Sequence, residues 1–291
     1  MHNRCMNRLS LDLRARVLGA LVEGCSVRGA ARMCDVQKNT VLRLLAEVGD
    51  ACQFFFDDTV RGVQSRYVQC DEIWSFCHAK ERNLPRELRG AMGVGDVWTW
   101  TAIDADSKVV VTWHLGKRTT ADADAFISDL AERIVSDRVQ ISTDGLTHYN
   151  LPIQRYFHHR ADHGSEVKDY GLLDDDTPER KYSPMVVKQV HRKPVWGVPD
   201  TDRISTAYVE RNNLTMRMSS RRFTRLTNGY SKKMLNLNRA LALHFMHYNF
   251  VRKHHTLKGK TPAMAAGLTD RFWTLRDLAL LPDILRNREA A

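Results

Sequence analysis

Three carboxylates stand where the chain could hold a divalent cation for chemistry on phosphate. Asp71 lies inside "RYVQCDEIWSF", Asp144 ends "RVQISTDG", and Glu210 lies near the start of the helical pattern "AYVERNNLTMRM". Mg²⁺ prefers oxygen ligands and takes only a few carboxylates, which leaves positions for water and substrate phosphates. Two such ions roughly 3.5–4 Å apart can bind both the attacking and the leaving oxygen of a phosphodiester. These residue types therefore indicate metal-dependent chemistry on a phosphodiester.

Other acidic residues in the chain have ordinary structural interpretations. Alternation along a strand points Glu72 to the face opposite Asp71. The acidic stretch "LLDDDTPE" (172–179) has no regular element to position it, so we interpret it as a solvated loop. Two further groups fit a hairpin turn and a solvated helix face: Asp104 and Asp106 in the first, and Asp122, Asp124 and Asp129 in the second.

The elements that would position the three carboxylates follow from local patterning. Runs rich in β-branched and aromatic residues predict strands at 66–76, 97–104, 108–116 and 138–145, with an amphipathic helix at 119–135. The order β-β-β-α-β followed by helices predicts an α/β domain. If the fourth strand pairs beside the first, Asp71 and Asp144 converge on one edge of the sheet.

Residues 158–203 are polar and contain several prolines. We expect a long irregular connection here, with one short strand near 185–190. Glu210 would then lie in the first helix after this connection.

The N-terminal segment 8–50 reads as three helices. Ser10 and Ser26 are suited to cap the first two, and a short turn at 34–36 precedes the third. This arrangement resembles a helix-turn-helix, in which the polar start of the last helix would meet bases and phosphates in the major groove. A three-helix packing module with a solvated face is the alternative. The predicted contacts are Lys38, Asn39, Thr40 and Arg43.

A strongly basic segment surrounds Glu210. Residues 203–260 contain 13 Lys or Arg against this one acid, a balance of 13 − 1 = +12, whereas the whole chain has 44 − 34 = +10. Such charge indicates a polyanionic partner. Helical spacing places Glu210 at the start of one helix face that continues through Asn213 and three arginines, and two lysines follow in the sequence. The predicted phosphate contacts are Asn213, Arg217, Arg221, Arg225, Lys232 and Lys233.

Cysteine spacing and hydropathy bound the remaining possibilities. All six cysteines lie in the first 77 residues and none forms a C-x-x-C pair, so neither a zinc ribbon nor a disulfide framework is expected. No apolar run approaches the roughly 18 residues of a membrane span, and the start lacks a signal-peptide pattern. The sequence predicts a cytoplasmic protein.

Several blocks together resemble one family. "QCDEIWSFCHAKERN", "GDVWTWTAIDADSK", "ISTDG", "ISTAYVERNNLTMRMSSRRFTRLTNGYSKK" and "HFMHYNFVRKHHTL" with "TPAMAAGL" are similar to transposases of the insertion-sequence-1 family, over about residues 8–270. Those are DDE enzymes built on an RNase H-like domain. Matched motif by motif, the resemblance implies that Asp71, Asp144 and Glu210 are the catalytic triad and the ligands of two Mg²⁺ or Mn²⁺ ions.

The resemblance carries further expectations. The helix-turn-helix would bind the terminal inverted repeats of a mobile element, and the protein would be associated with the nucleoid of a prokaryote. Joining two element ends implies a homo-oligomer of at least two protomers, acting on target DNA as well. Many members carry a zinc-binding module whose cysteine pairs are absent here, so no zinc is expected. The usual "TDGHKAY" reads "TDGLTHY", which leaves His148 as a partial substitute for the missing basic residue.

The predicted layout is therefore α/β with an all-α start. It has a helix-turn-helix domain at 1–55, a linker at 56–65, an RNase H-like mixed-sheet catalytic domain at 66–255 with an irregular insertion about 158–203, and a C-terminal helical tail at 256–291. Three functions remain open: an active DNA transposase, a helix-turn-helix regulator that has lost catalysis, and a related metal-dependent nuclease. The intact triad and basic segment favour the first over the second, and the sequence does not separate the first from the third.

Overall fold

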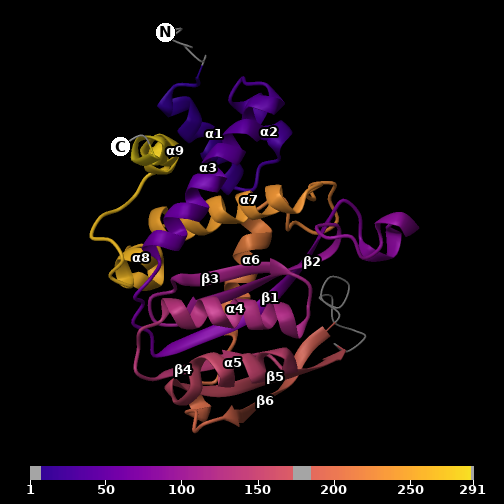
Figure 1. The fold of residues 1–291 in the computed structure, drawn as a ribbon, viewed down its shortest axis with the longest axis vertical. Helices are drawn as coiled ribbons and strands as arrows, with labels where there is room; N and C mark the ends of the chain where they lie inside the picture. The colour runs from indigo at the N-terminus through magenta and orange to yellow at the C-terminus, as the bar shows by residue number, and fades with distance from the viewer. Residues whose placement is uncertain (1–7, 173–184, 290–291) are drawn as a thin grey trace. The chain divides into compact units, whose positions relative to one another are not determined.

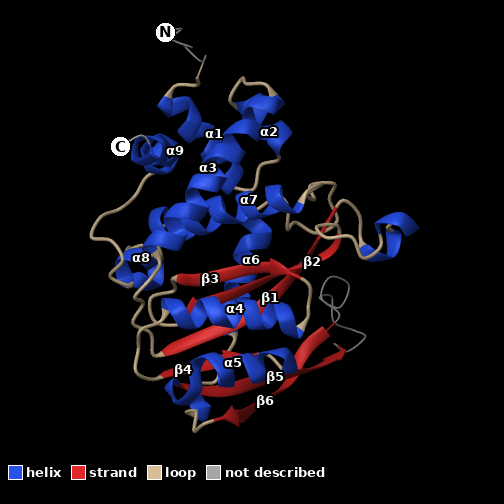
Figure 2. Cartoon of the chain, viewed as in Figure 1, coloured by secondary structure: helices blue, strands red, loops and turns tan. Residues whose placement is uncertain are grey.

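A computed structural model describes residues 8–172 and 185–289 as a mixed α/β protein (Figures 1 and 2). The chain divides into two compact units. A helix-rich unit comprises Met1–Arg61, Trp74–Trp98 and Asn212–Ala291, and a sheet unit comprises Gly62–Ile73 and Thr99–Arg211. Within the described residues no helix has the length and apolar character of a membrane span.

The sheet contains six strands in the order β3-β2-β1-β4-β5-β6. Strands β1 and β4 pair in parallel, as do β4 and β5, whereas β5 and β6 are antiparallel. The predicted first four strands are confirmed as β1 (Tyr67–Cys77), β2 (Gly95–Asp104), β3 (Val110–Gly116) and β4 (Val139–Thr143). Their register decides which polar side chains meet at the strand ends.

The irregular insertion predicted over 158–203 is wrong for most of its length, although the short strand expected near 185–190 is present as part of a longer strand. Strands β5 (Ala161–Leu172) and β6 (Met185–Trp196) form a twelve-residue antiparallel pair there. Strand β6 is half-buried or exposed along its whole length and lies at the edge of the sheet, so it lacks the apolar alternation that marks a strand in sequence. Most of the acidic stretch 172–179 lies outside the described residues.

Two helices lie over one face of the sheet (Figure 1). Helix α4 (Thr120–Arg133) confirms the predicted amphipathic helix, with Thr119 as its N-cap and Phe126, Ile127 and Leu130 buried. Helix α5 (Asn150–Phe157) was not singled out by the sequence patterns, and it follows the short 3-10 turn Thr147–Tyr149. The buried ring of Tyr149 packs edge-on to Trp100, so the core beneath these helices reaches the end of β4.

The helix-rich unit begins with the three predicted helices, α1 (Leu11–Val22), α2 (Val27–Met33) and α3 (Lys38–Thr59). Ser10 accepts a hydrogen bond from the Leu13 amide at 3.3 Å, and Ser26 accepts one from the Gly29 amide at 2.9 Å. As expected, each serine side chain pairs with a backbone amide in the first turn that has no partner within the helix. Helix α3 extends to Thr59, so it runs into the segment predicted as a linker.

The C-terminal helices complete this unit. They are α7 (Met234–Met246), which continues as the π-helix His247–Val251, then α8 (Pro262–Ala265) and α9 (Leu275–Glu289). Helix α3 packs against α7 so closely that a Cβ on Gly49 would lie 2.6 Å from the Cβ of Arg239. Helix α9 packs against α1 and α3. The segments predicted as an N-terminal domain and a C-terminal tail thus share one core.

Helix α6 (Ala207–Ser219) contains Glu210 and is divided between the two units. The predicted stripe does not continue as a single helix face, because α6 ends at Ser219 and the chain from 220 to 230 forms turns. Asn213 is 8% exposed, whereas Arg225 is exposed in a turn. Clustered β-turn residues after Ser219, including Asn228 and Gly229, oppose helix continuation.

Candidate active site

The strand register places Asp71 and Asp144 beside each other. The last residue pair between parallel strands β1 and β4 is Gln69 with Ser142. Asp71 and Asp144 each lie two residues beyond that pair, toward the carboxyl ends of their strands. Such ends of parallel strands are a common place for binding sites in α/β proteins. The predicted convergence of these two aspartates on one sheet edge is confirmed.

Asp144 is held in a fixed geometry at the end of β4. Its carboxylate accepts a hydrogen bond from the Leu146 amide at 2.8 Å, which closes a short turn after the strand. Its carbonyl oxygen accepts from the hydroxyls of Thr143 at 2.9 Å and of Ser165 at 3.0 Å. Strand β5, which carries Ser165, therefore helps to orient Asp144.

Glu72 belongs to the same group of carboxylates, contrary to the sequence prediction. One oxygen from each of Asp71, Glu72 and Asp144 lies within 4.8 Å of the others, which is close enough for a shared metal ion. Alternation along β1 sets the direction of the Glu72 Cβ, but it does not fix the position of the carboxylate at the end of the side chain. Strand β4 ends at Thr143, so no paired residue of β4 lies beside Glu72. The Arg118 guanidinium forms an ion pair with the Glu72 carboxylate at 2.5 Å, and the same guanidinium lies 3.6 Å from the Asp144 carboxylate.

Glu72 is the most buried member of this group, with its side chain 1% exposed. The Tyr149 hydroxyl donates to its carboxylate at 2.9 Å, in addition to the contact with Arg118. Burial and the Asp144 charge raise the pKa of Glu72, and Arg118 and Tyr149 oppose that rise. Glu72 is therefore anchored on two sides, which limits how far its carboxylate can move.

Burial makes Asp71 hard to ionise. Desolvation, followed by repulsion from Glu72 and Asp144 and a smaller effect of Glu210, raises the pKa of Asp71 to about 7. Like charges held together in a poorly solvated place are stabilised by a cation that all of them can reach. The arrangement therefore favours binding of a divalent cation over three separate ionised carboxylates.

Glu210 is positioned by the sheet at the start of α6. The side chain of Gln69 on β1 accepts hydrogen bonds from the backbone amides of Tyr208 at 2.7 Å and Val209 at 3.2 Å. Glu166 on β5 accepts one from the Thr206 amide at 3.2 Å. Two strands thus bind the backbone at the start of α6, and the charge of Glu210 in its first turn contributes to the raised pKa of Asp71.

Glu210 lies outside the 4.8 Å group and is engaged elsewhere. Its carboxylate forms an ion pair with Lys168 of β5 and accepts a hydrogen bond from the Thr206 hydroxyl at 2.6 Å. Lys168 also lies 3.5 Å from Glu166. The Glu210 side chain is 44% exposed, so it is the most solvent-accessible of these carboxylates.

The acids set aside by sequence have structural partners. Asp104 accepts hydrogen bonds from the Ser107 amide at 2.6 Å and its hydroxyl at 2.5 Å, which confirms turn chemistry in the β2–β3 hairpin. Asp124 on α4 pairs with Arg155 at 2.6 Å. His148 hydrogen-bonds the Thr120 hydroxyl at 2.8 Å, so its ring lies beside the start of α4.

Sequence reasoning missed the residues that organise the site. Lys168 stands in a polar stretch interpreted as irregular, and Arg118 follows β3 in a turn, so neither shows a local signal of its role. A recognisable β5 would have drawn attention to Lys168, since period-two alternation places it on the same face as Glu166.

Four of the ten predicted DNA contacts line one hollow in the helix-rich unit, namely Lys38, Arg221, Lys232 and Lys233. This basic hollow has a volume of about 800 Å³ and joins the start of α3 to the turn after α6. Its cationic lining includes Arg28, Lys38, Arg221, Arg222, Lys232 and Lys233. Asn39 and Arg43 on α3 are exposed, and Thr40 is half-buried. The tertiary structure thus brings together two sets of cations almost 200 residues apart.

The comparisons with known proteins include a partial structural likeness. No protein-family model and no curated protein matches the sequence. Among solved structures, the chain is similar to a piggyBac transposase in a synaptic complex with hairpin DNA, determined by cryo-EM. The TM-score is 0.43 and the sequence identity 9%, over 100% of this chain and 76% of that chain. A likeness with so low a score carries no argument about function.

Proposed function

We propose that this chain is a DNA transposase of the DDE type, whose sheet unit is an RNase H-like catalytic domain. The observation that carries the proposal is the placement of Asp71 and Asp144 at equivalent positions beyond the parallel β1–β4 pairing, with their carboxylates in one group. Asp71 lies within β1 and Asp144 directly follows β4, and carboxylates on such rigid supports are suited to hold cations in a defined geometry. Glu210 in α6 is the proposed third member of the triad.

The donor set fits Mg²⁺ or Mn²⁺. All the ligand atoms are carboxylate oxygens. The raised pKa of Asp71 reflects its desolvation and, after that, the neighbouring negative charge, which a divalent cation would stabilise. We propose that Asp71, Asp144 and Glu210 would hold the two ions. Bound ions supply Lewis-acid activation of water and of the phosphate.

The surrounding residues have distinct positioning roles in this proposal. Arg118 and Tyr149 fix Glu72, which keeps its charge beside Asp71 and Asp144 without leaving that charge unpaired. Lys168 neutralises Glu210 until its carboxylate is required, and the ammonium group is then available to a phosphate oxygen.

The reaction proposed is phosphoryl transfer in two steps without a covalent enzyme intermediate. Water attacks the phosphodiester at an element end, and the 3′-oxygen leaves with a proton as a free hydroxyl. That 3′-hydroxyl then attacks a phosphate of the target strand in line, and another 3′-hydroxyl is released. The residues of the sheet unit hold the reacting strand and orient the carboxylates through both steps.

The helix-rich unit is the proposed DNA-binding part. Exposed side chains at the start of α3 would enter the major groove of the terminal inverted repeats, as in a helix-turn-helix. Cations around the basic hollow would contact phosphates, so binding should weaken steeply with salt. Joining two element ends would require a homo-oligomer of at least two protomers.

An assay of strand joining tests this function. Purified protein is incubated with Mg²⁺, a duplex made from the inverted-repeat DNA flanking the coding sequence, and a supercoiled target plasmid. We expect nicked duplex and joined products from the wild type and neither from Glu210→Gln. Asp106→Asn is the matched control, because that carboxylate pairs with Arg66 at the surface and should leave both products unchanged.

The alternatives predict different products. Nicks without joined strands would favour a metal-dependent nuclease, and specific binding without any cleavage would favour a regulator. Full activity of Glu210→Gln would show that the triad assignment is wrong.

A further inference from the structure

An aromatic row leads away from the basic hollow within the helix-rich unit. Trp74 and Phe76 lie on one face of β1, with ring centroids 5.7 Å apart, and Phe76 lies 4.8 Å from the ring of Tyr230. Backbone pairing holds the row together: the His78 amide, directly after β1, donates to the carbonyl of Ser231 at 2.9 Å. Ser231 follows the turns that connect α6 to α7. All three rings are half-buried rather than fully enclosed.

Each end of this row meets cations. At one end Tyr230 lines the basic hollow together with Lys232 and Lys233. At the other end Trp74 lines a second cavity of about 700 Å³, which we call the Trp74 cavity. Lys80 lies over the Trp74 ring at 5.7 Å from its centroid.

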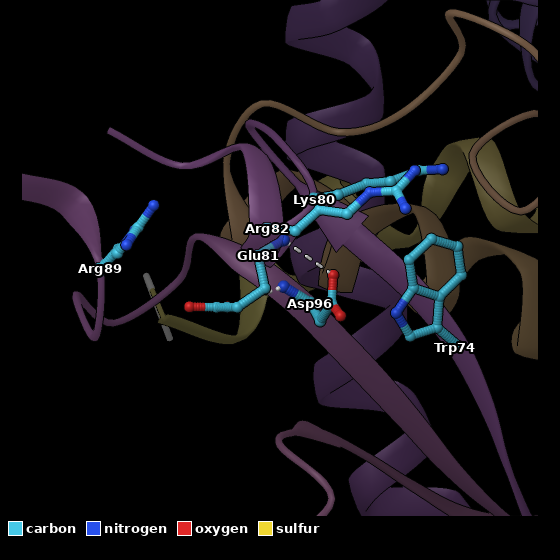
Figure 3. Close-up of a pocket in the computed structure, with 6 residues that line it drawn as sticks. All are labelled: Trp74, Lys80, Glu81, Arg82, Arg89 and Asp96. Carbon is cyan, nitrogen blue, oxygen red and sulfur yellow. Dashed lines mark hydrogen bonds between the residues drawn. The ribbon is translucent and has the colours of Figure 1, made fainter. Parts of the chain in front are cut away.

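The Trp74 cavity is itself cationic on its accessible side. Figure 3 shows the side chains of Lys80 and Arg82 extending together toward the side where the Trp74 ring lies, with Arg89 at the other end of the group. The two acids in the lining are tied to backbone. Asp96 accepts from the Glu81 amide at 3.0 Å, and Glu81 accepts from the Asp96 amide at 3.2 Å.

We propose that the row Trp74–Phe76–Tyr230 binds unpaired DNA bases, with the backbone running from the basic hollow to the Trp74 cavity. Aromatic faces interleaved with cations are the combination that single-stranded nucleic acid requires, since every base has a face to stack and every nucleotide a phosphate to pair. A paired duplex buries its base faces and could use only the cations. This inference rests on the proposed action on DNA and adds that part of the substrate is melted.

Binding to matched oligonucleotides tests this inference. Fluorescence anisotropy compares a labelled mixed-sequence single strand with the duplex of the same sequence at one salt concentration. We expect Trp74→Ala to weaken single-strand binding about tenfold, the order of one lost base stack, and duplex binding less than twofold. Trp74→Phe should restore most of the loss.

Controls separate stacking from folding and from charge. Trp196→Ala removes an exposed tryptophan from β6 in the other unit and should change neither affinity. Lys80→Gln keeps the aromatic row and should weaken single-strand binding. Should Trp74→Ala fail to fold by circular dichroism, Tyr230→Ala takes its place with the same expectation.

Two results would overturn the inference: unchanged single-strand affinity in a folded Trp74→Ala or Tyr230→Ala protein, or equal losses on single strand and duplex. Failure of the proposed function is distinguishable, because Asp71→Asn should abolish strand joining and leave single-strand binding intact. If the wild-type protein joins no strands but binds a single strand through Trp74, the single-strand site is supported and the transposase proposal is not.

Discussion

The two compact units of this chain carry opposite charge. The helix-rich unit has 28 Lys or Arg and 14 Asp or Glu, a balance of 28 − 14 = +14, whereas the sheet unit has 16 − 20 = −4. One residue type also behaves differently in the two units. Asp71 in the sheet unit has a pKa raised to about 7, and Asp283 in the helix-rich unit has one lowered to about 2.

The physical causes of these two shifts differ. Asp71 is desolvated among other carboxylates, so its proton is retained. For Asp283 desolvation is the largest single cause, but the hydrogen bonds from Arg8, Arg286 and Arg14 together outweigh it and lower the pKa. An acid that resists ionisation is suited to a cation site, and one that is already paired is suited to holding helices together. The difference agrees with the proposed division of roles, in which the sheet unit carries the chemistry and the helix-rich unit binds DNA.

The largest expected effect is on strand cleavage. Asp71→Asn or Asp144→Asn should lower the rate by about a thousandfold or more, because each removes a carboxylate from the proposed cation site. Asp283→Asn should leave the rate nearly unchanged at a temperature where the protein is folded. Nicking of labelled duplex under single-turnover conditions measures all three. A comparable loss in Asp283→Asn would remove the distinction between the units.

The second effect is on DNA affinity. The triple variant Lys38→Gln, Lys232→Gln, Lys233→Gln removes three cations of the basic hollow, and should reduce the slope of log affinity against log salt by about 3. Lys188 and Lys193 on β6 offer a matched pair of lysines in the sheet unit. Anisotropy titrations over several salt concentrations measure the slopes. Equal changes per charge in both units would contradict the assignment of binding to the helix-rich unit.

The third effect concerns the ion pair between Lys168 and Glu210. Lys168→Met should raise the affinity of the DNA-free protein for Mn²⁺ by roughly tenfold, because the ammonium group no longer competes for the carboxylate. Titration followed by electron paramagnetic resonance measures free Mn²⁺ directly. Arg138→Met is the control, since Arg138 pairs with Asp162, a carboxylate outside the proposed triad. A drop in affinity would show that Lys168 positions Glu210 instead of restraining it.

The fourth effect is a pH dependence of stabilisation by metal. Below a pH of about 7 Asp71 keeps its proton in the folded, metal-free protein, while the unfolded chain has lost it above its ordinary value of 3.8. Stability of the metal-free protein therefore falls as pH rises toward 7 and then levels. The rise in Tm caused by a saturating Mg²⁺ concentration should be larger at about pH 8 than at about pH 6. Asp71→Asn should lose this difference, and a wild type without it would contradict the raised pKa.

The smallest effect is on global stability. Asp283→Asn should lower the free energy of unfolding by about 1 kcal/mol, after allowance for solvent screening. Because its folded pKa is depressed, this contribution is present above 3.8 and disappears as pH falls toward 2. Urea unfolding of wild type and variant at neutral and acidic pH measures both. A constant difference at every pH would assign the loss to packing instead of charge.

Local patterns predicted much of the fold but not the polar edge of the sheet. The three N-terminal helices, β1 to β4 and α4 follow from capping residues and from apolar periodicity, which act within a few residues. Strands β5 and β6 lack that periodicity, because pairing partners and ion pairs such as Arg192 with Glu166 stabilise them. Because β5 could not be recognised from its sequence, the role of Lys168 on that strand could not be predicted either.

The sequence alone determined the types of chemistry available: the candidate carboxylates, the basic excess around Glu210 and the absence of a cysteine pattern for zinc. Those depend on residue identity and spacing. Only the tertiary structure decided which groups meet. It placed Glu72 with Asp71 and Asp144, paired Glu210 with Lys168, and gathered Lys38 and Lys232 around one hollow. Such contacts depend on strand register and helix ends, which are set by packing between segments distant in the chain.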